Sequence, residues 1–355
     1  MNILDNLKIY KQLDEQDLYG SLTKLGRQIE SGWTSAEFVS LNFDPEKIRN
    51  IVFAGMGGSN LAAHTALALS PLLLRVPFEI VANYRLPSYS DKNTLVILSS
   101  YSGNTEEILS CAQDATMRGC PSVVITTGGQ LQTTVNKNKL PLILLDQKFN
   151  PSHTPRAGIG LSLGAVLGLL IRLNPSSQKY FDLKEIIRTV ERVFDMVNIH
   201  KETSENPAKS LAAKHKGSGI ILFSANHLTG VGKTIANYLN ESAKTMSHSF
   251  VFPDLNHHLL EGFTFPAGLR DQTNIIILNS SLYPEVIQKR IHITKDILTQ
   301  QKYKVTILNP ETTDITNQVF ESLVFLIMFS YYLSISNKVD PITNPWVDYL
   351  KNKIH

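Results

Sequence analysis

Charge and cysteine are both scarce in this chain of 355 residues. Only 18% of the residues are charged, the formal net charge is +3, and no run of Lys or Arg exceeds two residues. Nucleic-acid binding generally uses a concentrated basic patch, so this class of protein is not indicated. The two cysteines, Cys111 and Cys120, are too few for a metal or disulfide framework. We expect both to be reduced thiols of a cytoplasmic protein.

Long hydrophobic runs are lacking as well. The N-terminus, MNILDNLKIYKQLDEQD, alternates charged with apolar residues and has no signal-peptide core. The most membrane-like stretch, 158–173 (GIGLSLGAVLGLLIRL), is shorter than the roughly 20 apolar residues that cross a bilayer. It predicts a buried glycine-rich helix, and we expect a soluble protein with no membrane partner.

The chain does contain an internal repeat. An apolar run, a turn of small residues and a helical stretch occur at 50–69 and again at 219–244. A strand–loop–helix–strand pattern at 94–126 has a counterpart at 274–308. Continuous Ile/Val/Leu strands separated by helices predict parallel sheets covered on both faces. The predicted fold class is therefore α/β, with two flavodoxin-like domains, and the chain length also favours two.

We assign the first domain to residues 1–150 and the second to residues 151–355. The join, from about residue 150 to residue 216, holds the glycine-rich helix and a charged amphipathic stretch at 181–197. A helix at 318–334 and a last short helix at 346–353 complete the second domain.

Two turns of the first domain carry residues suited to an anion. GMGGS follows one predicted strand, and SYSGNTEE, residues 100–107, follows another. Ligands of open α/β sheets lie beyond the carboxyl ends of the strands, where helix N-termini attract phosphate. The second domain has SSLYPE in place of SYSGNT, so we expect one anion site and not two.

Other interpretations of these turns are weaker. Ser and Asn before a helix are ordinary caps, which is the simplest account of SYSGNTEE alone. The dinucleotide fingerprint needs a small residue at position 60, which is Asn, and a Walker motif lacks its first glycine near 225–227. With both turns at neighbouring strand ends, a phosphate site is favoured.

The ordered set of motifs resembles the bifunctional phosphoglucose/phosphomannose isomerases, which are built from two sugar-isomerase (SIS) domains. The motifs are GMGGS, SYSGNTEE, Pro155-Arg156-Ala157-Gly158, Leu239-Asn240-Glu241 and Leu255-Asn256-His257. The resemblance runs from about residue 45 to the C-terminus. It implies aldose–ketose isomerisation of glucose or mannose 6-phosphate to fructose 6-phosphate, without a metal or other cofactor.

The resemblance also implies roles for individual residues. Glu241 would be the base that moves the proton between C1 and C2, and Arg156 would stabilise the enediolate. His257 and Lys351 would assist ring opening, with Lys353 a close competitor of Lys351. The histidine would come from the partner subunit of a homodimer. The 6-phosphate would be held by Gly57, Gly58, Ser59, Ser100, Ser102 and Thr105.

General chemistry favours the same roles. Abstraction of a proton beside a carbonyl uses a carboxylate, and the enediolate needs a fixed cation, which Arg supplies. Ring opening suits a histidine, which exchanges protons near neutrality. Each residue also has a simpler interpretation: Glu241 as a solvated helix residue, His257 as a loop residue, Lys351 as a surface lysine.

The chain departs from the family at several motifs. The family more often has Pro-Arg-Ala-Ala, Asn-Glu-Asn and Asn-His-Asn-Glu, where this chain has PRAG, NES and NHHL. None of these changes removes a reactive group. Thr343 and Asn344 stand where the family places a small polar residue that leaves room for the C2 epimer. Phosphoglucose activity is therefore better supported than phosphomannose activity.

Three other functions compete with this interpretation. His257, His258 and Glu261, with His248 nearby, could form a metal site, but the β-barrel usual for metal-dependent phosphomannose isomerases does not fit this pattern. A non-catalytic sugar-phosphate sensor would need an added DNA-binding domain, for which the first 45 residues are too few and too acidic. An isomerase of another sugar phosphate is the main alternative.

Overall fold

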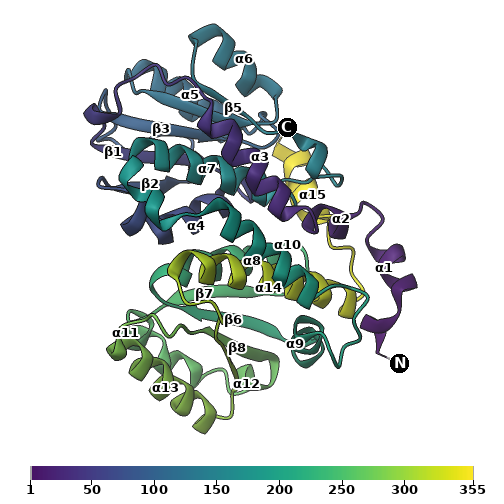
Figure 1. Ribbon diagram of the computed structural model, residues 1–355. Coiled ribbons are helices and arrows are strands. Elements are labelled where there is room, and N and C mark those ends of the chain that lie inside the picture. The colour runs from purple at the N-terminus through teal and green to yellow at the C-terminus, as the bar shows by residue number, and fades with distance from the viewer. Residues whose placement is uncertain (1, 355) are drawn as a thin grey trace. The chain divides into compact units, whose positions relative to one another are not determined.

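The computed structural model describes residues 2–354 and separates into two compact units. The first unit is Gly20–Val190, and the second unit combines Met1–Tyr19 with Glu191–His355 (Figure 1). These units do not coincide with the ranges 1–150 and 151–355. The chain between 151 and 190 packs with the first unit, and the first residues pack with the second.

The first unit is a five-stranded parallel sheet in the order β2-β1-β3-β4-β5, which is the flavodoxin-like order. Its strands β1 and β3 are almost completely buried, as their continuous apolar sequences predict. The strands are β1 (Asn50–Gly55), β2 (Phe78–Val81), β3 (Thr94–Ser99), β4 (Ser122–Thr126) and β5 (Leu142–Leu144).

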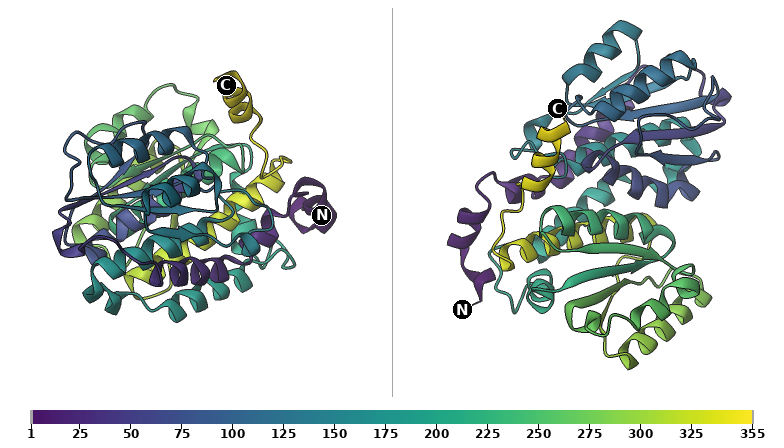
Figure 2. Two further views of the ribbon diagram at one scale, coloured as in Figure 1. Left: turned by 90° about the horizontal axis from the view of Figure 1, so that it is seen from above. Right: turned by 180° about the vertical axis from the view of Figure 1, so that it is seen from behind.

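Helices cover both faces of this sheet (Figures 1 and 2). One face packs against α4 (Gly58–Leu73), α7 (Ile159–Leu173) and α3 (Leu25–Glu37). The other packs against α5 (Glu106–Met117) and α6 (Gly129–Asn138), with an apolar core between them and the sheet. The unit also contains most of α2 (Leu18–Leu22), part of α8 (Leu183–Met196), and the short 3-10 helices Pro45–Lys47, Gln147–Phe149 and Pro175–Tyr180.

The glycine-rich helix α7 belongs to the first unit because its glycines let it approach α3 closely. A Cβ at Gly164 would lie 2.1 Å from the Ile29 carbonyl oxygen, and one at Gly32 would lie 2.0 Å from the Leu161 carbonyl oxygen. Gly160 and Gly168 of α7 also lie close to α3, and we call this line of glycine contacts between α3 and α7 the glycine seam. The ring of Trp33, on α3, is 6% exposed. The predicted buried glycine-rich helix is therefore confirmed, and its packing explains why the unit extends past residue 150.

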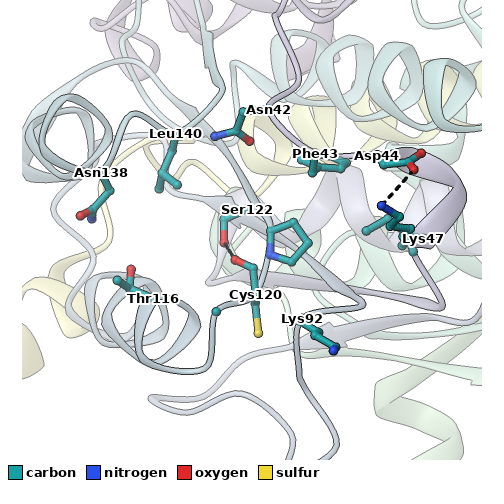
Figure 3. A pocket seen from close by; sticks show the side chains of 13 residues that line it. Asn42, Phe43, Asp44, Lys47, Lys92, Thr116, Cys120, Ser122, Asn138 and Leu140 are labelled. Carbon is teal, nitrogen blue, oxygen red and sulfur yellow. Dashed lines mark hydrogen bonds and ion pairs between the residues drawn. The ribbon is translucent and has the colours of Figure 1, made fainter.

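A cavity of about 470 Å³ lies at the amino edge of the same sheet, away from the carboxyl ends of the strands (Figure 3). Its polar groups are largely engaged with the protein itself. The Ser122 and Thr116 hydroxyls donate to backbone carbonyls at 3.1 and 2.9 Å, and the Asn42 amide donates to another at 3.0 Å. Lys47 pairs with Asp44 at 3.6 Å. This amino-edge cavity thus leaves few groups to bind a ligand.

The second unit has a four-stranded parallel sheet in the order β7-β6-β8-β9, the same order without a fifth strand. Its strands are β6 (Gly219–Ser224), β7 (Ser247–Val251), β8 (Thr273–Leu278) and β9 (Lys304–Leu308). The helices α9 (Pro207–His215), α10 (Thr229–Glu241) and α14 (Ile315–Ser336) pack together, and α13 (Glu285–Gln300) packs near β9. Shorter elements are α1 (Leu7–Leu13), α11 (Leu255–His258), α12 (Leu269–Gln272), α15 (Pro345–Ile354) and the 3-10 helices Ile3–Asp5, Asn226–Leu228 and Leu260–Phe263.

Among the described residues, only α14 is long and apolar enough to cross a membrane. Helix α7 is also apolar but shorter, so by length α14, and not 158–173, is the segment that could span a membrane. Its most apolar window is 89% buried inside the protein. A helix that is apolar all round and buried is typical of the core of a large domain.

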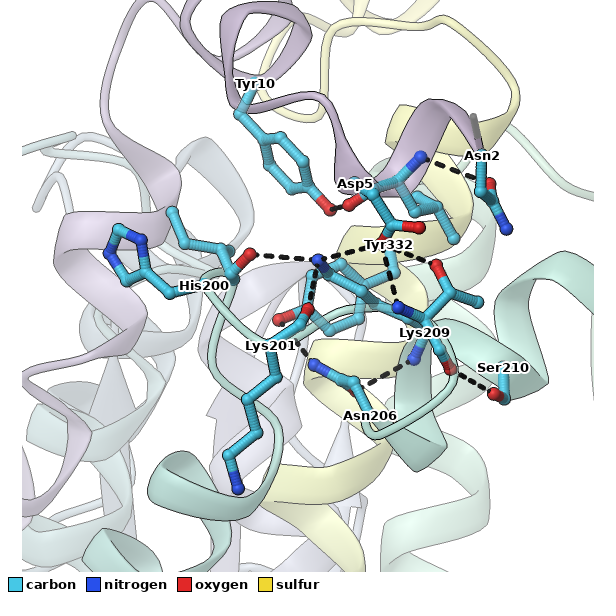
Figure 4. Close-up of polar contacts among 12 residues, drawn as sticks. Asn2, Asp5, Tyr10, His200, Lys201, Asn206, Lys209, Ser210 and Tyr332 are labelled. Atoms are coloured by element: carbon cyan, nitrogen blue, oxygen red, sulfur yellow. Dashed lines mark hydrogen bonds and ion pairs between the residues drawn. The ribbon is translucent and has the colours of Figure 1, made fainter.

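The N-terminal segment is fastened to the second unit by a buried lysine (Figure 4). Lys209 is 1% exposed, and its ammonium lies 5.6 and 5.7 Å from the ring centres of Tyr10 and Tyr332. It pairs with Asp5 at 3.6 Å and donates to the carbonyl oxygens of Ile199 and Lys201 at 2.9 and 2.7 Å. These contacts place residues that precede the first unit in the core of the second.

Candidate functional site

The two predicted anion-binding turns lie side by side at the switch point of the first sheet. Strands β1 and β3 are neighbours, with Gly55 paired to Ser99 at their carboxyl ends. GMGGS leaves β1 and enters α4, and SYSGNT leaves β3 and enters α5. The strand order reverses between β1 and β3, which is where open α/β sheets bind ligands.

The hydroxyl groups of SYSGNT form a compact hydrogen-bonded loop. The Ser100 and Thr105 hydroxyls lie 2.7 Å apart, and Ser100 Oγ also accepts from the Gly103 amide at 3.1 Å. Ser102 Oγ accepts from the Asn104 amide at 3.3 Å. Thr105 is the N-cap residue of α5, yet within the described chain it makes no side-chain capping bond. The simple helix-cap interpretation therefore does not explain this loop.

Glycines allow a second loop to support the first. Gly103 has a φ of +70°, and a Cβ there would lie 1.8 Å from the Gly128 carbonyl oxygen. A Cβ at Gly129 would lie 2.4 Å from the Ser102 carbonyl oxygen. The Leu131 amide donates to the Gly103 carbonyl at 2.9 Å. The loop after β4 thus holds the hydroxyl loop in shape.

The GMGGS turn contacts both the hydroxyl loop and the segment that carries Arg156. Ser59 Oγ accepts from the Tyr101 amide at 3.1 Å. A Cβ at Gly58 would lie 2.9 Å from Pro155 Cβ and 3.1 Å from the Arg156 amide nitrogen. Gly57 has a φ of +51° and precedes α4, a backbone conformation that favours glycine. The structure therefore brings the Arg156 backbone directly against the anion-binding turn.

Arg156 is 4% exposed, although a charged side chain is rarely buried so completely. The following Gly158 lies against the Tyr101 ring, since a Cβ there would be 2.6 Å from Tyr101 Cε2. The Gly that replaces the family's second Ala therefore accommodates this ring. Arg156, Ser59 and the hydroxyl loop are parts of one assembly within the first unit.

Glu241 lies in the second unit, at the last residue of α10. It is partly exposed, and its Oε2 accepts from the Asn344 amide at 3.4 Å. Asn240 pairs with Ser247, the first residue of β7, through bonds of 2.9 and 3.0 Å. Glu241 is therefore located at the amino edge of the second sheet, next to the residue that precedes α15.

His257 lies at the opposite edge of that sheet. It is exposed in α11, which follows the carboxyl end of β7. Five residues of β7 separate the two edges, which corresponds to about 15 Å at the usual rise of a strand. Within one chain, the structure does not bring His257 to Glu241.

Lys351 and Lys353 are both exposed on α15. The ammonium of Lys353 lies 5.8 Å from the Tyr349 ring centre. Every residue of α15 is exposed, including Trp346 at 83%. Asn344, which contacts Glu241, directly precedes this helix.

The corresponding switch point of the second unit is filled by protein side chains. The Gln318 amide oxygen lies 2.9 Å from His227 Nε2 and accepts from the Ser280 hydroxyl at 2.6 Å. The Tyr283 hydroxyl accepts from the Ala225 amide at 3.4 Å. Burial lowers the pKa of His227, so this cluster does not supply a cation. Protein side chains thus bond to one another where the first unit has its hydroxyl loop.

The metal alternative finds no support in the described part of the chain. Among residues 2–354, no three His, Cys, Asp or Glu side chains converge on a point that could hold an ion. His257, His258, Glu261 and His248 therefore do not form the cluster that their spacing suggested.

Sequence reasoning missed the buried polar residues that hold the loops of the site by hydrogen bonds. Tyr101 connects Ser59 with Asn150, whose amide donates to the Tyr101 hydroxyl at 2.6 Å. Gln28 is fully buried on α3. One signal was available: Gln28 is a polar residue within the apolar stripe of a helix, between Leu25 and Gly32.

Comparison with known proteins finds a matching domain family in each half of the chain. Residues 46–140 match the SIS domain family, and residues 204–354 match the bacterial phospho-glucose isomerase C-terminal SIS domain. The chain is 28% identical to the bifunctional phosphoglucose/phosphomannose isomerase of Caldicellulosiruptor bescii, over 95% of this chain and 98% of that protein. It is 28% identical to the enzyme of the same name from Thermoplasma acidophilum, over 86% and 89%.

A relative of different activity is also similar. The D-glucosamine-6-phosphate 4-epimerase of Sulfolobus acidocaldarius is 26% identical over 61% of this chain and 65% of that protein.

Solved structures share the fold at lower identity. The C-terminal domain of glucosamine-fructose-6-phosphate aminotransferase from Francisella tularensis superposes with a TM-score of 0.66 at 14% identity, over 90% of this chain and 96% of that one. Glucosamine-6-phosphate deaminase from Thermotoga maritima gives 0.63 at 18%, over 92% and 97%. The predicted fold of two SIS-type α/β domains is confirmed.

Proposed function

Because the chain belongs to the two-domain SIS family of bifunctional phosphoglucose/phosphomannose isomerases, we propose that it interconverts glucose 6-phosphate, and also mannose 6-phosphate, with fructose 6-phosphate. The reaction proceeds through a cis-enediolate without a metal. The observation that carries this proposal is the assembly in the first unit, where Gly58 of the anion-binding turn lies against the backbone of the buried Arg156.

In this proposal the first unit binds the phosphate and stabilises charge. Ser59, Ser100, Ser102 and Thr105 donate hydrogen bonds to the 6-phosphate, and the amides after Gly57 and Gly58 add the N-terminus of α4. The Arg156 guanidinium stabilises the negative charge that develops on the enediolate oxygen, which it can do at any physiological pH.

The second unit supplies the proton chemistry. Glu241 abstracts the proton from C2 and returns it to C1, because a partly exposed carboxylate on a helix end can reach a substrate. Its contact with Asn344 supports this role, since a hydrogen bond fixes the orientation of the carboxylate. Lys351 and His257 assist ring opening.

The position of His257 supports a homodimer in which this residue acts on the other chain. His257 and Glu241 lie at opposite edges of one sheet, about 15 Å apart along β7. A histidine that takes part in the reaction with Glu241 would therefore come from the partner subunit. The exposure of His257 is compatible with such a contact.

One observation favours a second function. The similarity to a D-glucosamine-6-phosphate 4-epimerase shows that related chains act on other sugar phosphates. The hydroxyl loop recognises the phosphate and does not read the rest of the sugar. An isomerase of another sugar phosphate, or a regulator that only binds one, is the alternative.

A cytoplasmic location also belongs to this proposal. Cys111 and Cys120 are free and buried, and burial raises the pKa of each thiol to about 11. Such thiols are unreactive, as expected of structural cysteines in a reducing compartment.

A coupled assay for fructose 6-phosphate tests the proposal. It is run from glucose 6-phosphate and from mannose 6-phosphate, with and without EDTA, and with glucosamine 6-phosphate as the competing substrate. Turnover of both hexose phosphates in EDTA is expected. Turnover of glucose 6-phosphate alone would restrict the proposal and assign specificity to Thr343 and Asn344. No turnover, with retained sugar-phosphate binding, would refute it in favour of the alternative.

A further inference from the structure

Two buried amide side chains hold the backbone on either side of Arg156. Gln28 on α3 and Asn150, just after the 3-10 helix Gln147–Phe149, are both 0% exposed. The Asn150 amide donates to the Thr154 carbonyl at 2.9 Å, two residues before Arg156. The Gln28 amide donates to the Ala157 carbonyl at 3.0 Å, one residue after it. Side-chain hydrogen bonds therefore hold the backbone on both sides of Arg156, at Thr154 and at Ala157.

Gln28 uses both ends of its amide. Its oxygen accepts from the Gly160 amide, in the first turn of α7, at 3.1 Å. Its nitrogen also lies 2.9 Å from the Ser21 carbonyl and 3.0 Å from the Phe149 carbonyl. The Gln28 side chain therefore connects α3 to the first turn of α7 and to the backbone of Phe149. A buried polar group is stabilising only when it is satisfied in this way.

Asn150 connects the same segment to the anion-binding loop. Its amide donates to the Tyr101 hydroxyl at 2.6 Å, and its oxygen accepts from the Ser152 hydroxyl at 3.0 Å. The Tyr101 amide in turn donates to Ser59 Oγ. The backbone around Arg156 and the hydroxyl loop are therefore held to one another through Tyr101 and Asn150.

We propose that Gln28 and Asn150 are positioning residues that fix Arg156 relative to the bound sugar phosphate. This inference rests on the proposed function, because it assumes that Arg156 stabilises the enediolate. A guanidinium that stabilises a transition state must be held in place before the reaction, and an error of about 1 Å can cost on the order of 100-fold in rate. The loss of either amide lets the backbone at Arg156 relax without removing any group that touches the substrate.

The test compares Gln28→Met, which keeps the length of the side chain but removes its hydrogen bonds, with Asn150→Asp. The aspartate cannot donate to the Thr154 carbonyl, but its oxygen can accept from the Tyr101 hydroxyl and so keep the link to the hydroxyl loop. We expect kcat to fall by about 10- to 100-fold in each variant while KM changes less than about twofold. The affinity for a hydroxamate analogue of the enediolate should fall in proportion to kcat. Inhibition by inorganic phosphate, which reports on the hydroxyl loop, should stay within about twofold of the wild type.

Ile29→Val is the matched control, since Ile29 is also 0% exposed on α3 and neighbours Gln28 in sequence. It lowers the melting temperature without touching the Arg156 segment, and its kcat should remain that of the wild type. If Gln28→Met does not fold, Asn150→Asp decides the question alone, because it approaches Arg156 from the other side.

Two results would overturn the inference. One is an unchanged kcat in a folded variant. The other is an equal loss of phosphate and hydroxamate affinity, which would indicate general loosening of the unit. An inactive wild-type protein would instead count against the proposed function, so the two failures are distinguishable.

Discussion

At the scale of single residues, this protein places chemically useful groups where burial or position changes their properties. Arg156 is buried against the anion-binding turn, and Glu241 is accessible at a helix end. His215 is 0% exposed, and burial lowers its pKa to about 4, assisted by the charges of Lys214 and Lys304. Such groups affect either the reaction or the pH dependence of folding.

Replacement of Glu241 by Gln removes the proposed base and keeps the shape of the side chain. Proton exchange at C2 in deuterated water, followed by NMR, should fall by about 10²- to 10⁴-fold, the usual contribution of a general base. The affinity for the sugar phosphate should change little, because the proposed phosphate contacts lie in the first unit. Glu285→Gln, at an exposed carboxylate on α13, is the control. Exchange at the wild-type rate in Glu241→Gln would exclude it from the mechanism.

His215 predicts sensitivity to acid. Its folded pKa is about 4 and its unfolded value is 6.5, so the unfolded chain binds the extra proton between these limits. The free energy of unfolding should therefore fall as pH drops from about 6.5 to 4, by about 3 kcal/mol from this residue alone.

His215→Leu should remove that part of the pH dependence, because leucine does not titrate. The ring makes one long contact, 3.5 Å from Nε2 to the Thr306 hydroxyl, and Nδ1 has no hydrogen-bond partner among the described residues. Urea unfolding of the variant and the wild type at pH 7 and pH 4 measures the difference. His292→Leu, at an exposed ring on α13, is the matched control. Parallel pH curves for His215→Leu and the wild type would contradict the prediction.

At the scale of elements, close packing between helices decides which unit a segment joins. Helix α7 is glycine-rich because α3 approaches its backbone, with the Ile29 carbonyl only 2.1 Å from where a Cβ of Gly164 would lie. Glycine normally weakens a helix relative to alanine. In this seam it is required by the approach of the two backbones.

Gly164→Ala should therefore destabilise the protein, contrary to the usual gain of about 1 kcal/mol in a helix. We expect a loss of about 1–3 kcal/mol, because the clash is with backbone that cannot move aside easily. Gly262→Ala is the control, since no described atom lies within 4 Å of a Cβ there. Chemical denaturation measures both, and a Gly164→Ala protein as stable as the wild type would show that the seam can open.

Sequence and structure agree best where a pattern is local. Strands β1, β3, β4, β6, β8 and β9, the turns at 55–60 and 100–105 and the helices at 159–173 and 345–354 follow from apolar runs and small residues that act on their neighbours. The sequence did not predict β5 or β7. The division into units could not be predicted in this way. It depends on Lys209 and on the glycine seam, which bring together residues far apart in the chain.

The supporting residues of the site were hidden for the same reason. Gln28 and Asn150 are ordinary polar residues by type, and only the fold shows that their amides are buried against the Arg156 segment. Likewise, the sequence SSLYPE showed that the second anion loop is missing, but not that Gln318 from α14 fills its place.

At the scale of the whole molecule, the hydroxyl loop occurs at the switch point of one repeat, and the corresponding switch point of the other holds Gln318, His227 and Ser280. The chain leaves the second unit at Tyr19 and returns to it at Glu191, so the first unit is inserted within the second. Lys209 holds the N-terminal segment, which precedes the insertion, in the second unit through its ion pair with Asp5. The hydroxyl loop, which is the proposed phosphate site, lies in the inserted unit.

Titration calorimetry should accordingly find one sugar-phosphate site per chain. Ser100→Ala should weaken binding, because it removes a hydroxyl of the loop. Ser280→Ala, in the filled switch point of the second unit, should leave binding unchanged. Two equivalent sites per chain would refute this arrangement.

The chain has two tryptophans, one in each unit, with very different surroundings. Trp33 is 6% exposed in the glycine seam, and Trp346 is 83% exposed at the start of α15. Iodide, a quencher that acts from the solvent, should therefore quench the fluorescence of Trp346 and leave that of Trp33 largely unchanged. In Trp33→Phe the remaining emission reports on α15 alone, so quenching by iodide follows any event that covers the helix beside Glu241, without a label.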